Sequence, residues 1–347
     1  MKALRRFEKS PRAARIEEVA RPEPGIGEVL LKVSYCGICG SDLHAYLNHA
    51  GYESVLPQVT FGHEWSGTVV STGSGVAAWK PDDRATMVAI QAMDPECRYV
   101  KAGWPQLSPS RRVQGLHLDG GMAEYVLVDQ RFLLPLPVGL DMVSAALTEP
   151  LSVADHCITN CSDIGPGDNV VVSGPGIIGM LCAIVARHKG ANVLVTGTEA
   201  DDKARLPAAR KVGFPTAKVG EGCPSLDLQA KGIFGSEADA LVEASGAGNA
   251  LAGSWKSVRT DGKVTVVALY GQDVTMDMTQ FVRKQIAIRT SYGSAPSSYQ
   301  KAMELLSCGV VPVSDLTKVY PLADGIQAFT DAENQEVMKP MLDCGAN

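Results

Sequence analysis

The sequence predicts an α/β protein that combines a β-rich unit with a doubly wound parallel sheet. Three observations support this fold class. Short strand-like runs broken by Gly and Pro fill the first 140 residues, for example 29–33, 67–70 and 123–128. From about residue 165, apolar runs typical of buried strands alternate with helical stretches. After about residue 293, short strands and turns return, so we expect the tail to rejoin the first unit.

The alternating part begins with a clear βαβ unit. A buried-strand run at 169–173 leads into a Gly-rich turn, an apolar helix that ends near residue 189 and a second strand at 193–196. Further strand-like runs continue the alternation at 240–243, 262–268 and 286–289. An amphipathic helix at 298–307 is the one helix that we expect in the tail.

Composition and charge exclude several classes of protein. The 347 residues carry a formal charge of −6 without a basic run, which argues against a nucleic-acid partner. No apolar stretch reaches the length of a signal peptide or the roughly 18 residues of a membrane span. Nine cysteines, an odd number spread along a long chain, fit a reducing compartment. We therefore expect a cytoplasmic protein without membrane contact.

The turn after the first buried strand has the spacing G-x-G-x-x-G. Gly174 suits a tight turn, Gly176 allows close backbone approach to a pyrophosphate, and Gly179 allows helix-to-strand packing. Ile177 and Ile178 open the helix, whose N-terminus attracts a diphosphate. A plain tight turn is the alternative, but the βαβ context favours dinucleotide binding.

An acidic residue about 20 positions after this turn grips the adenosine ribose in many such folds. The strand-end position here is Gly197 or Thr198, depending on register, and neither is acidic. Nearby carboxylates would repel a 2′-phosphate, whereas Lys203 and Arg205 would attract it. The choice between NAD and NADP stays open, with a slight preference for NAD through Glu199.

A second cluster offers metal ligands. Cys36 and Cys39 form a C-x-x-C without a second such pair, so a redox pair or half of a structural zinc site is one interpretation. The other interpretation is a single metal site that combines one thiol, one imidazole and two carboxylates, from Cys39, His63, Glu64 and Glu149. This mixed set is typical of a catalytic zinc with an exchangeable position.

The segments 37–44, 62–69 and 148–152, followed by the G-x-G-x-x-G turn, resemble the zinc-dependent medium-chain alcohol dehydrogenases, most of all the sorbitol and polyol branch. The resemblance implies a GroES-like catalytic domain over 1–151 and 294–347. It also implies a Rossmann dinucleotide-binding domain over 152–293, and a homo-oligomer, either a dimer or a tetramer.

The resemblance also implies roles for single residues. Cys39 and His63 match zinc ligands, Glu64 matches a carboxylate ligand, and Glu149 matches one that binds directly or through water. Asp42 would accept the second ring N–H of His63. Ser41 and His44 match a relay that carries the alcohol proton to solvent. The alternatives are that Ser41 and Asp42 cap a helix and that His44 is a surface histidine.

The sequence departs from the family in two places. Asp94, Cys97, Val100 and Ser108 occupy the four positions where relatives carry cysteines for a structural zinc. Val100 has no ligand atom, so we predict that this zinc is absent and that each chain holds one catalytic zinc. Tyr292 and Gly293 stand where polyol dehydrogenases usually have an Arg-Tyr pair, and Ala45 stands where an aromatic hydroxyl is common.

These features predict an oxidoreductase that exchanges a hydride between a secondary alcohol (a polyol, sugar or sugar acid) and a nicotinamide cofactor, with zinc as Lewis acid. Tyr46, Trp65, Tyr292 and Tyr299 either line the pocket or pack in the core. The alternatives are a zinc-free enone or quinone reductase of the same fold, and a non-catalytic dinucleotide-binding protein.

Overall fold

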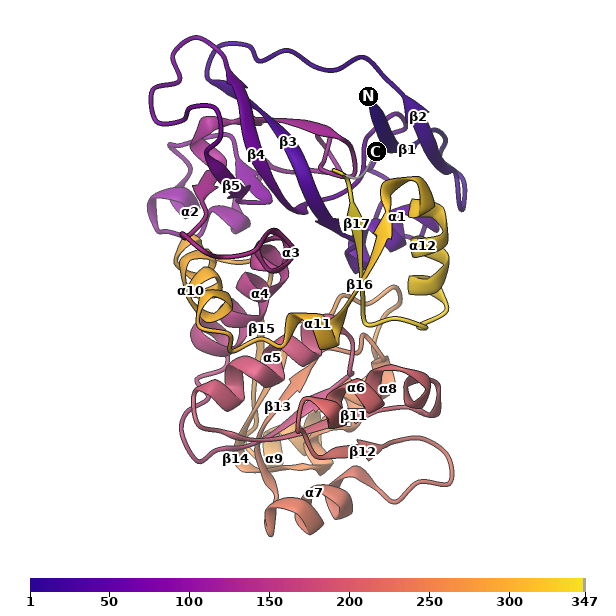
Figure 1. Ribbon diagram of the computed structural model, residues 1–347. Coiled ribbons are helices and arrows are strands. Elements are labelled where there is room, and N and C mark those ends of the chain that lie inside the picture. Colours follow the sequence, from indigo (N-terminus) through magenta and orange to yellow (C-terminus); the bar gives the residue numbers. More distant parts are fainter. Residues whose placement is uncertain (346–347) are drawn as a thin grey trace. The chain divides into compact units, whose positions relative to one another are not determined.

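The computed structural model describes residues 1–345, which form two compact units (Figure 1). The first unit comprises Met1–Glu149, Ala295–Gly309 and the chain from Thr317 onwards. The second comprises Pro150–Ser294 and Val310–Leu316. The first unit is therefore assembled from segments that are far apart in the sequence.

The first unit is built on a seven-stranded, mainly antiparallel sheet. Its order is β16-β17-β3-β4-β5-β9, with β8 also paired to β3, and β16 and β17 are parallel. The strands are β3 (Glu28–Gly37), β4 (Glu64–Thr72), β5 (Arg84–Met87), β8 (Tyr125–Asp129), β9 (Leu133–Pro135), β16 (Thr317–Pro321) and β17 (Lys339–Asp343). Two hairpin-like pairs flank it: β1 (Lys2–Arg6) with β2 (Ala14–Glu18), and β6 (Ile90–Ala92) with β7 (Arg111–Val113).

The central strand β3 carries apolar residues on both faces. Val29 and Leu31 belong to the core of this unit, and Leu30, which alternates with them along the strand, is 2% exposed. Strands β4 and β8 pair with the two edges of β3. Trp65 and Phe329 extend the same core and are fully buried. This core fixes the ends of β3 and β4, where the metal-ligand candidates lie.

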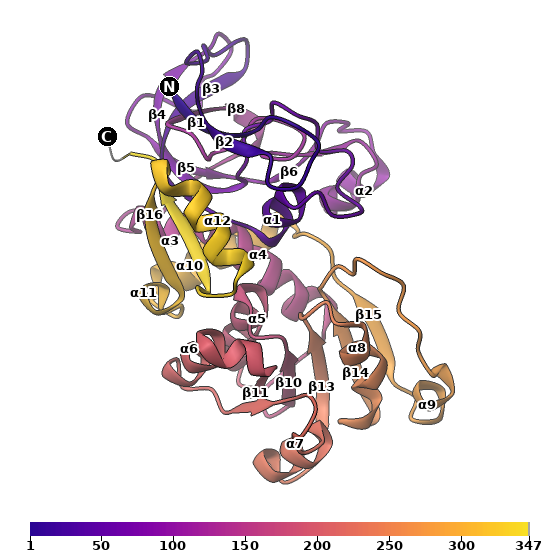
Figure 2. The ribbon, with the colours of Figure 1, turned by 90° about the vertical axis from the view of Figure 1, so that its right-hand side faces the viewer.

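The helices of the first unit are α1 (Gly40–Tyr46), α2 (Arg98–Lys101), α3 (Met142–Ala146), α10 (Pro296–Ser307) and α12 (Gly325–Glu333). The expectation that only strands and turns follow residue 307 is wrong for α12 and for the short helix α11 (Val313–Leu316). Ala328 and Phe329 of α12 are buried, and this helix packs beside α1 and β17 (Figures 1 and 2). The C-terminal segment thus completes the core around the first helix.

The second unit contains a six-stranded parallel sheet of order β12-β11-β10-β13-β14-β15. The strands are β10 (Asn169–Ser173), β11 (Asn192–Gly197), β12 (Thr216–Lys218), β13 (Ala238–Glu243), β14 (Val258–Val266) and β15 (Ala287–Thr290). Val170, Val171 and Val172 are fully buried, as expected for a parallel strand covered on both faces. The strand order reverses between β10 and β13, and such switch points bind ligands in doubly wound folds.

The helices of the second unit are α5 (Ile177–His188), α6 (Arg205–Lys211), α7 (Leu226–Phe234), α8 (Gly248–Gly253), α9 (Met278–Arg283) and α11 (Val313–Leu316). Helix α4 (Thr148–Asp155) begins at the end of the first unit and continues into a π-helical turn, His156–Cys161. Short 3-10 turns occur at Pro105–Leu107, Gln130–Phe132, Glu199–Lys203, Ser254–Lys256 and Leu322–Asp324. Across residues 1–345, no helix has the length and apolar character needed to cross a membrane.

Candidate metal and dinucleotide sites

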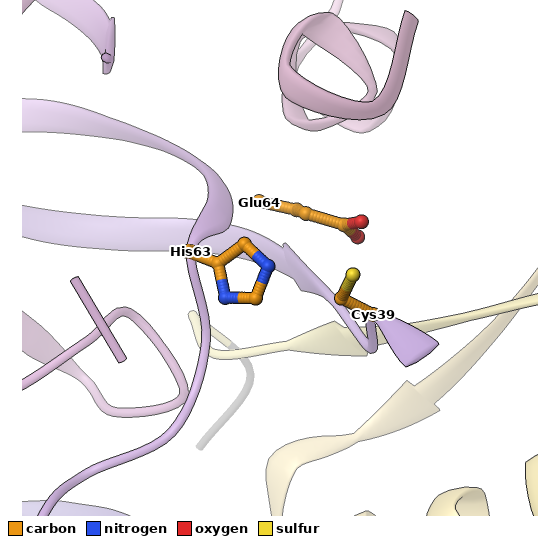
Figure 3. Close-up of side chains that lie close together, drawn as sticks. All are labelled: Cys39, His63 and Glu64. Atoms are coloured by element: carbon orange, nitrogen blue, oxygen red, sulfur yellow. The ribbon is translucent and has the colours of Figure 1, made fainter. Parts of the chain in front are cut away.

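Cys39, His63 and Glu64 converge at one end of the seven-stranded sheet (Figure 3). One ligand atom from each lies within 4.8 Å of the others. Cys39 directly precedes α1, whereas His63 immediately precedes β4 and Glu64 is its first residue. The pairing of Gly37 with Glu64 in the sheet brings these two segments together.

Asp42 anchors two of these candidates from within α1. Its Oδ2 accepts a hydrogen bond from the Cys39 N–H at 3.0 Å, and its Oδ1 lies 3.5 Å from Nδ1 of His63. Burial lowers the pKa of His63, but the charges of Asp42 and Cys39 outweigh it, so the pKa lies well above the usual value. Asp42 therefore both caps the helix and orients His63, which joins the two interpretations made from the sequence.

Lys339, which was not expected from the sequence, completes the cluster. Its fully buried ammonium forms an ion pair with Glu64 and donates a hydrogen bond to the Ile38 carbonyl at 2.8 Å. Burial by itself lowers the pKa of Lys339. The charges of Glu64 and Cys39 have the larger combined effect, so the pKa lies above its usual value. The available signal was a lysine directly before the apolar residues Pro340, Met341 and Leu342 of β17.

Glu149 faces the same cluster from the first turn of α4. The side chain is 8% exposed, and burial together with the charge of Glu64 raises its pKa to about 7, although His63 and Lys339 oppose the shift. Within the described chain, the group of atoms that lie within 4.8 Å of one another does not include Glu149. It is thus a neighbour of the other three rather than a member of the tight group.

The two candidate relay residues have different partners. The Ser41 hydroxyl lies 3.3 Å from Nε2 of His63, at the edge of the ligand cluster. His44 is exposed, its Nδ1 is 2.8 Å from Nδ1 of His49, and its ring stacks on Tyr52. Partial burial and the neighbouring His49 lower the pKa of His44, which favours its neutral form at neutral pH.

The lobe between β6 and β7 contains the positions that relatives use for a structural zinc. Cys97 precedes α2, and hydrogen bonds from the Ser108 side chain and the Tyr99 backbone lower the pKa of its thiol. Val100 lies within α2 and offers no ligand atom. The contacts of this lobe are those of a packed turn, including buried Gln106 and Ser108.

The glycine turn lies at the carboxyl end of β10. Gly174 has a φ of +100°, and a Cβ atom there would lie 2.7 Å from the Ser245 Cα atom. A Cβ on Gly179 would overlap the Gly174 carbonyl, whereas a Cβ on Gly176 would meet nothing within 4 Å. Ile177 is the first residue of α5, so the helix N-terminus faces this open space.

Thr198 and Glu199 follow β11 on the adjacent strand. Thr198 is exposed and hydrogen-bonds to Asp201, while the Glu199 carboxylate is paired with Lys218 at 2.7 Å. Gly197 is the last residue of β11. The structure thus places Thr198, rather than a carboxylate, directly after the strand end.

Three of the four aromatic residues considered for the pocket belong to the core. Tyr46 packs on Phe329 with ring centroids 4.8 Å apart. Trp65 is fully buried and donates to Gln114, and the Tyr299 hydroxyl accepts from the Ala89 N–H. Tyr292, in contrast, is 37% exposed.

Two family models match the chain. The alcohol dehydrogenase GroES-like domain covers residues 25–138, and the zinc-binding dehydrogenase model covers residues 178–308. The chain is 34% identical to a sorbitol dehydrogenase of Halalkalibacterium halodurans, over 99% of both proteins. It is 32% identical to a D-arabitol-phosphate dehydrogenase of Enterococcus avium, over 94% of this chain and 92% of the relative.

Solved structures agree with this relationship. The fold is similar to 2R,3R-butanediol dehydrogenase from Bacillus subtilis, with a TM-score of 0.88, 26% identity and 99% of both chains covered. It is also similar to a zinc-binding dehydrogenase from Sinorhizobium meliloti bound to NADP, with a TM-score of 0.87, 27% identity, and 99% of this chain and 98% of that chain covered.

The predicted fold, a GroES-like unit with a Rossmann sheet, is confirmed by these matches. The chain belongs to the zinc-binding alcohol dehydrogenase family, in the branch that includes sorbitol dehydrogenase, and is an oxidoreductase that transfers a hydride between a secondary alcohol and a nicotinamide cofactor.

Proposed function

We propose that Cys39, His63 and Glu64 hold the catalytic zinc and that Glu149 binds it directly or through water. The observation that carries this assignment is the convergence of a thiol, an imidazole and a carboxylate within 4.8 Å. The donor set fits zinc, which accepts sulfur, nitrogen and oxygen ligands and keeps an open position in catalytic sites. Asp42, next to the His63 ring, supplies the outer partner that a metal-bound imidazole needs.

The protein side of the reaction consists of binding, charge control and proton movement. Zinc, when bound, supplies a Lewis acid that lowers the pKa of the substrate hydroxyl. Ser41, beside His63, would accept the substrate's hydroxyl proton while passing its own proton to the ribose of the bound cofactor. Exposed His44 would take a proton from that ribose and release it to solvent with its partner His49. Lys339 neutralises Glu64, which limits the negative charge of a cluster that also contains a thiol and Glu149.

We infer that the lobe with Asp94, Cys97, Val100 and Ser108 holds no second zinc, so that each chain binds one. Val100 has no ligand atom, and one thiol among oxygen atoms is a poor tetrahedral zinc site. The unit that contains the ligands then serves as the catalytic domain. The unit with the glycine turn, where Gly174, Gly176, Ile177, Ile178 and Gly179 surround the open helix N-terminus, serves as the dinucleotide domain.

For the substrate, we propose a polyol or a sugar acid. The relatives are named for such compounds: sorbitol, D-arabitol phosphate and L-galactonate. Tyr292, Gly293 and Ala45 differ from the usual polyol pattern, so the hydroxyl groups away from the reacting carbon must meet other side chains. This departure favours a sugar acid or a shorter polyol over sorbitol itself.

For the cofactor, we propose NAD in preference to NADP. The 3-10 turn after β11 carries three carboxylates, Glu199, Asp201 and Asp202, within one turn of the strand end. Asp201 is the buried one of the three, and its negative charge disfavours a 2′-phosphate, although Lys203 and Arg205 lie in the same region. Glu199, which carried this preference in the sequence, is exposed and paired with Lys218.

We also propose a homo-oligomer, either a dimer or a tetramer. All four residues of the edge strand β15 are exposed, and Ile288 is 39% exposed. A bare edge strand offers unpaired N–H and C=O groups to another chain. Mass photometry at nanomolar concentration tests this: a single peak at the mass of one chain would contradict it.

The experiment that tests the function is a substrate panel with the zinc-loaded protein. Sorbitol, xylitol, arabitol, L-galactonate, other sugar acids and 2,3-butanediol are each assayed with NAD and with NADP. We expect zinc-dependent reduction of cofactor with at least one polyol or sugar acid. Turnover of enones or quinones without zinc, or cofactor binding without turnover on any alcohol, would support the zinc-free reductase or the non-catalytic alternative.

A further inference from the structure

We propose that Thr198 and Asp201 form the group that distinguishes a ribose hydroxyl from a 2′-phosphate, and that Glu199 does not take part. This inference rests on the proposed use of a nicotinamide dinucleotide and deepens it. It assigns cofactor specificity to a hydroxyl whose hydrogen-bond direction is fixed by a buried carboxylate.

The turn that carries these residues lies against the glycine turn. The Gly174 N–H donates to the Thr196 carbonyl at 3.0 Å, which joins the carboxyl ends of β10 and β11. A Cβ on Gly197 would lie 2.8 Å from Cγ of Pro175 and 3.1 Å from Cβ of Asp201. The space at the strand end is therefore filled by Pro175 and Asp201, and this close packing leaves no room for a side chain at position 197. In doubly wound folds this strand end faces the adenosine ribose.

Asp201 fixes the direction of the Thr198 hydroxyl. Its Oδ2 accepts hydrogen bonds from the Thr198 N–H at 2.8 Å and from the Thr198 hydroxyl at 2.9 Å. An ionised carboxylate can only accept, and a hydroxyl has one proton. The Thr198 oxygen also accepts from the Asp201 N–H in a capping box, so this exposed residue is left with one acceptor position toward a ligand.

This polarity favours a ribose over its 2′-phosphate. A ribose hydroxyl can donate to the Thr198 oxygen, whereas a phosphate dianion has only acceptor oxygens and would meet another acceptor backed by the Asp201 charge. Sites built around one hydrogen-bond direction discriminate strongly because the wrong partner leaves polar groups unpaired. Asp201 is 7% exposed, so water does little to screen this effect.

Three other charged groups near this turn have partners of their own, whereas Lys203 is exposed. Glu199 is 82% exposed in its side chain and is paired with Lys218. Asp202 is paired with Arg210 at 2.9 Å. Arg205 lies 3.3 Å from Oδ1 of Asp201, so its charge is partly neutralised as long as Asp201 is ionised.

The test measures the dissociation constants of NADH and NADPH by fluorescence titration of the full-length protein. In Asp201→Asn, the amide oxygen can still accept from the Thr198 N–H, but the negative charge next to the Thr198 hydroxyl is lost and Arg205 loses its acidic partner. We expect the ratio of the NADPH to the NADH dissociation constant to fall at least tenfold. Glu199→Gln is the matched control, with a change of less than twofold in the ratio.

Thr198→Val and Thr198→Ser test the same inference should Asp201→Asn fail to fold, as judged by its circular dichroism melt. We expect Thr198→Val to weaken NADH binding about fivefold or more with a smaller effect on NADPH, and Thr198→Ser to preserve the wild-type ratio. The inference is overturned when the wild type binds NADPH as tightly as NADH, when neither Asp201→Asn nor Thr198→Val shifts the ratio, or when Glu199→Gln shifts it equally. Failure of the wild type to bind either cofactor would instead overturn the proposed function on which the inference rests.

Discussion

Replacing Lys339 with Met keeps the length of the side chain and removes the charge that neutralises Glu64. Both partners are buried, with side-chain exposures of 0% and 1%. Removing one partner of such a pair costs about 3–5 kcal/mol, because the other charge is left uncompensated in the interior. For a unit of this size, each kcal/mol corresponds to about 2–4 °C in Tm. The zinc-free variant should therefore melt roughly 6–20 °C below the wild type.

Zinc should reduce this loss. With zinc bound, Glu64 gains a cationic partner, so we expect the Tm difference between Lys339→Met and the wild type to fall to less than half of its zinc-free value. Differential scanning calorimetry with and without zinc measures both differences. Lys301→Met is the matched control, since Lys301 pairs with Glu304 on the surface and its loss should leave Tm almost unchanged. This reasoning would be refuted if Lys339→Met lowered the Tm of the zinc-free protein by less than about 2 °C, or if it lowered the Tm equally with and without zinc.

Three other substitutions probe the same account. Burial raises the pKa of Glu149 to about 7, so in the zinc-free protein its contribution to stability is present below about pH 4.5 and is lost as the pH rises through 7. The free energy of unfolding of Glu149→Gln should therefore rise by about 3 kcal/mol relative to that of the wild type between pH 5 and pH 8, as measured by denaturant titration. Parallel pH profiles of the two proteins would contradict this. Gly37→Ala would place a Cβ against the Glu64 carboxylate and 2.8 Å from Cε of Lys339, so zinc retention on dialysis should fall at least tenfold, and normal retention would show that the cluster is more adaptable than we infer. Cys97→Ser should leave the zinc content and the Tm of the purified protein unchanged, whereas loss of one zinc would reveal a structural site in that lobe.

Local patterns in the sequence were sufficient to predict the dinucleotide turn and the βαβ unit. The G-x-G-x-x-G spacing and the run of valines at 170–172 are patterns of residues that are adjacent in the sequence, so they can be interpreted without knowledge of the tertiary structure. The roles of Cys39 and Asp42, by contrast, were implied by the resemblance to a known family. Helix α12 was missed because polar residues such as Gln327 and Thr330 interrupt its apolar positions, and packing against α1 and β17 stabilises it.

Long-range contacts were the part that the sequence could not provide. Lys339 donates a hydrogen bond to the Ile38 carbonyl, 301 positions away in the sequence. No local pattern predicts which buried carboxylate a lysine will pair with. Asp201 is a related case. The sequence placed its carboxylate near the strand end, but its hydrogen bond with the Thr198 hydroxyl depends on the geometry of the turn after β11. Both cases involve a charge whose partner is defined by the fold.

The central claim is that one zinc binds at Cys39, His63 and Glu64. The most direct test is zinc content per chain, measured by inductively coupled plasma mass spectrometry on the wild type and on Cys39→Ser, both purified without added zinc and dialysed against a weak chelator. The account predicts about one zinc per wild-type chain and close to none in the variant. Two zinc ions in the wild type, or an unchanged content in Cys39→Ser, would contradict it.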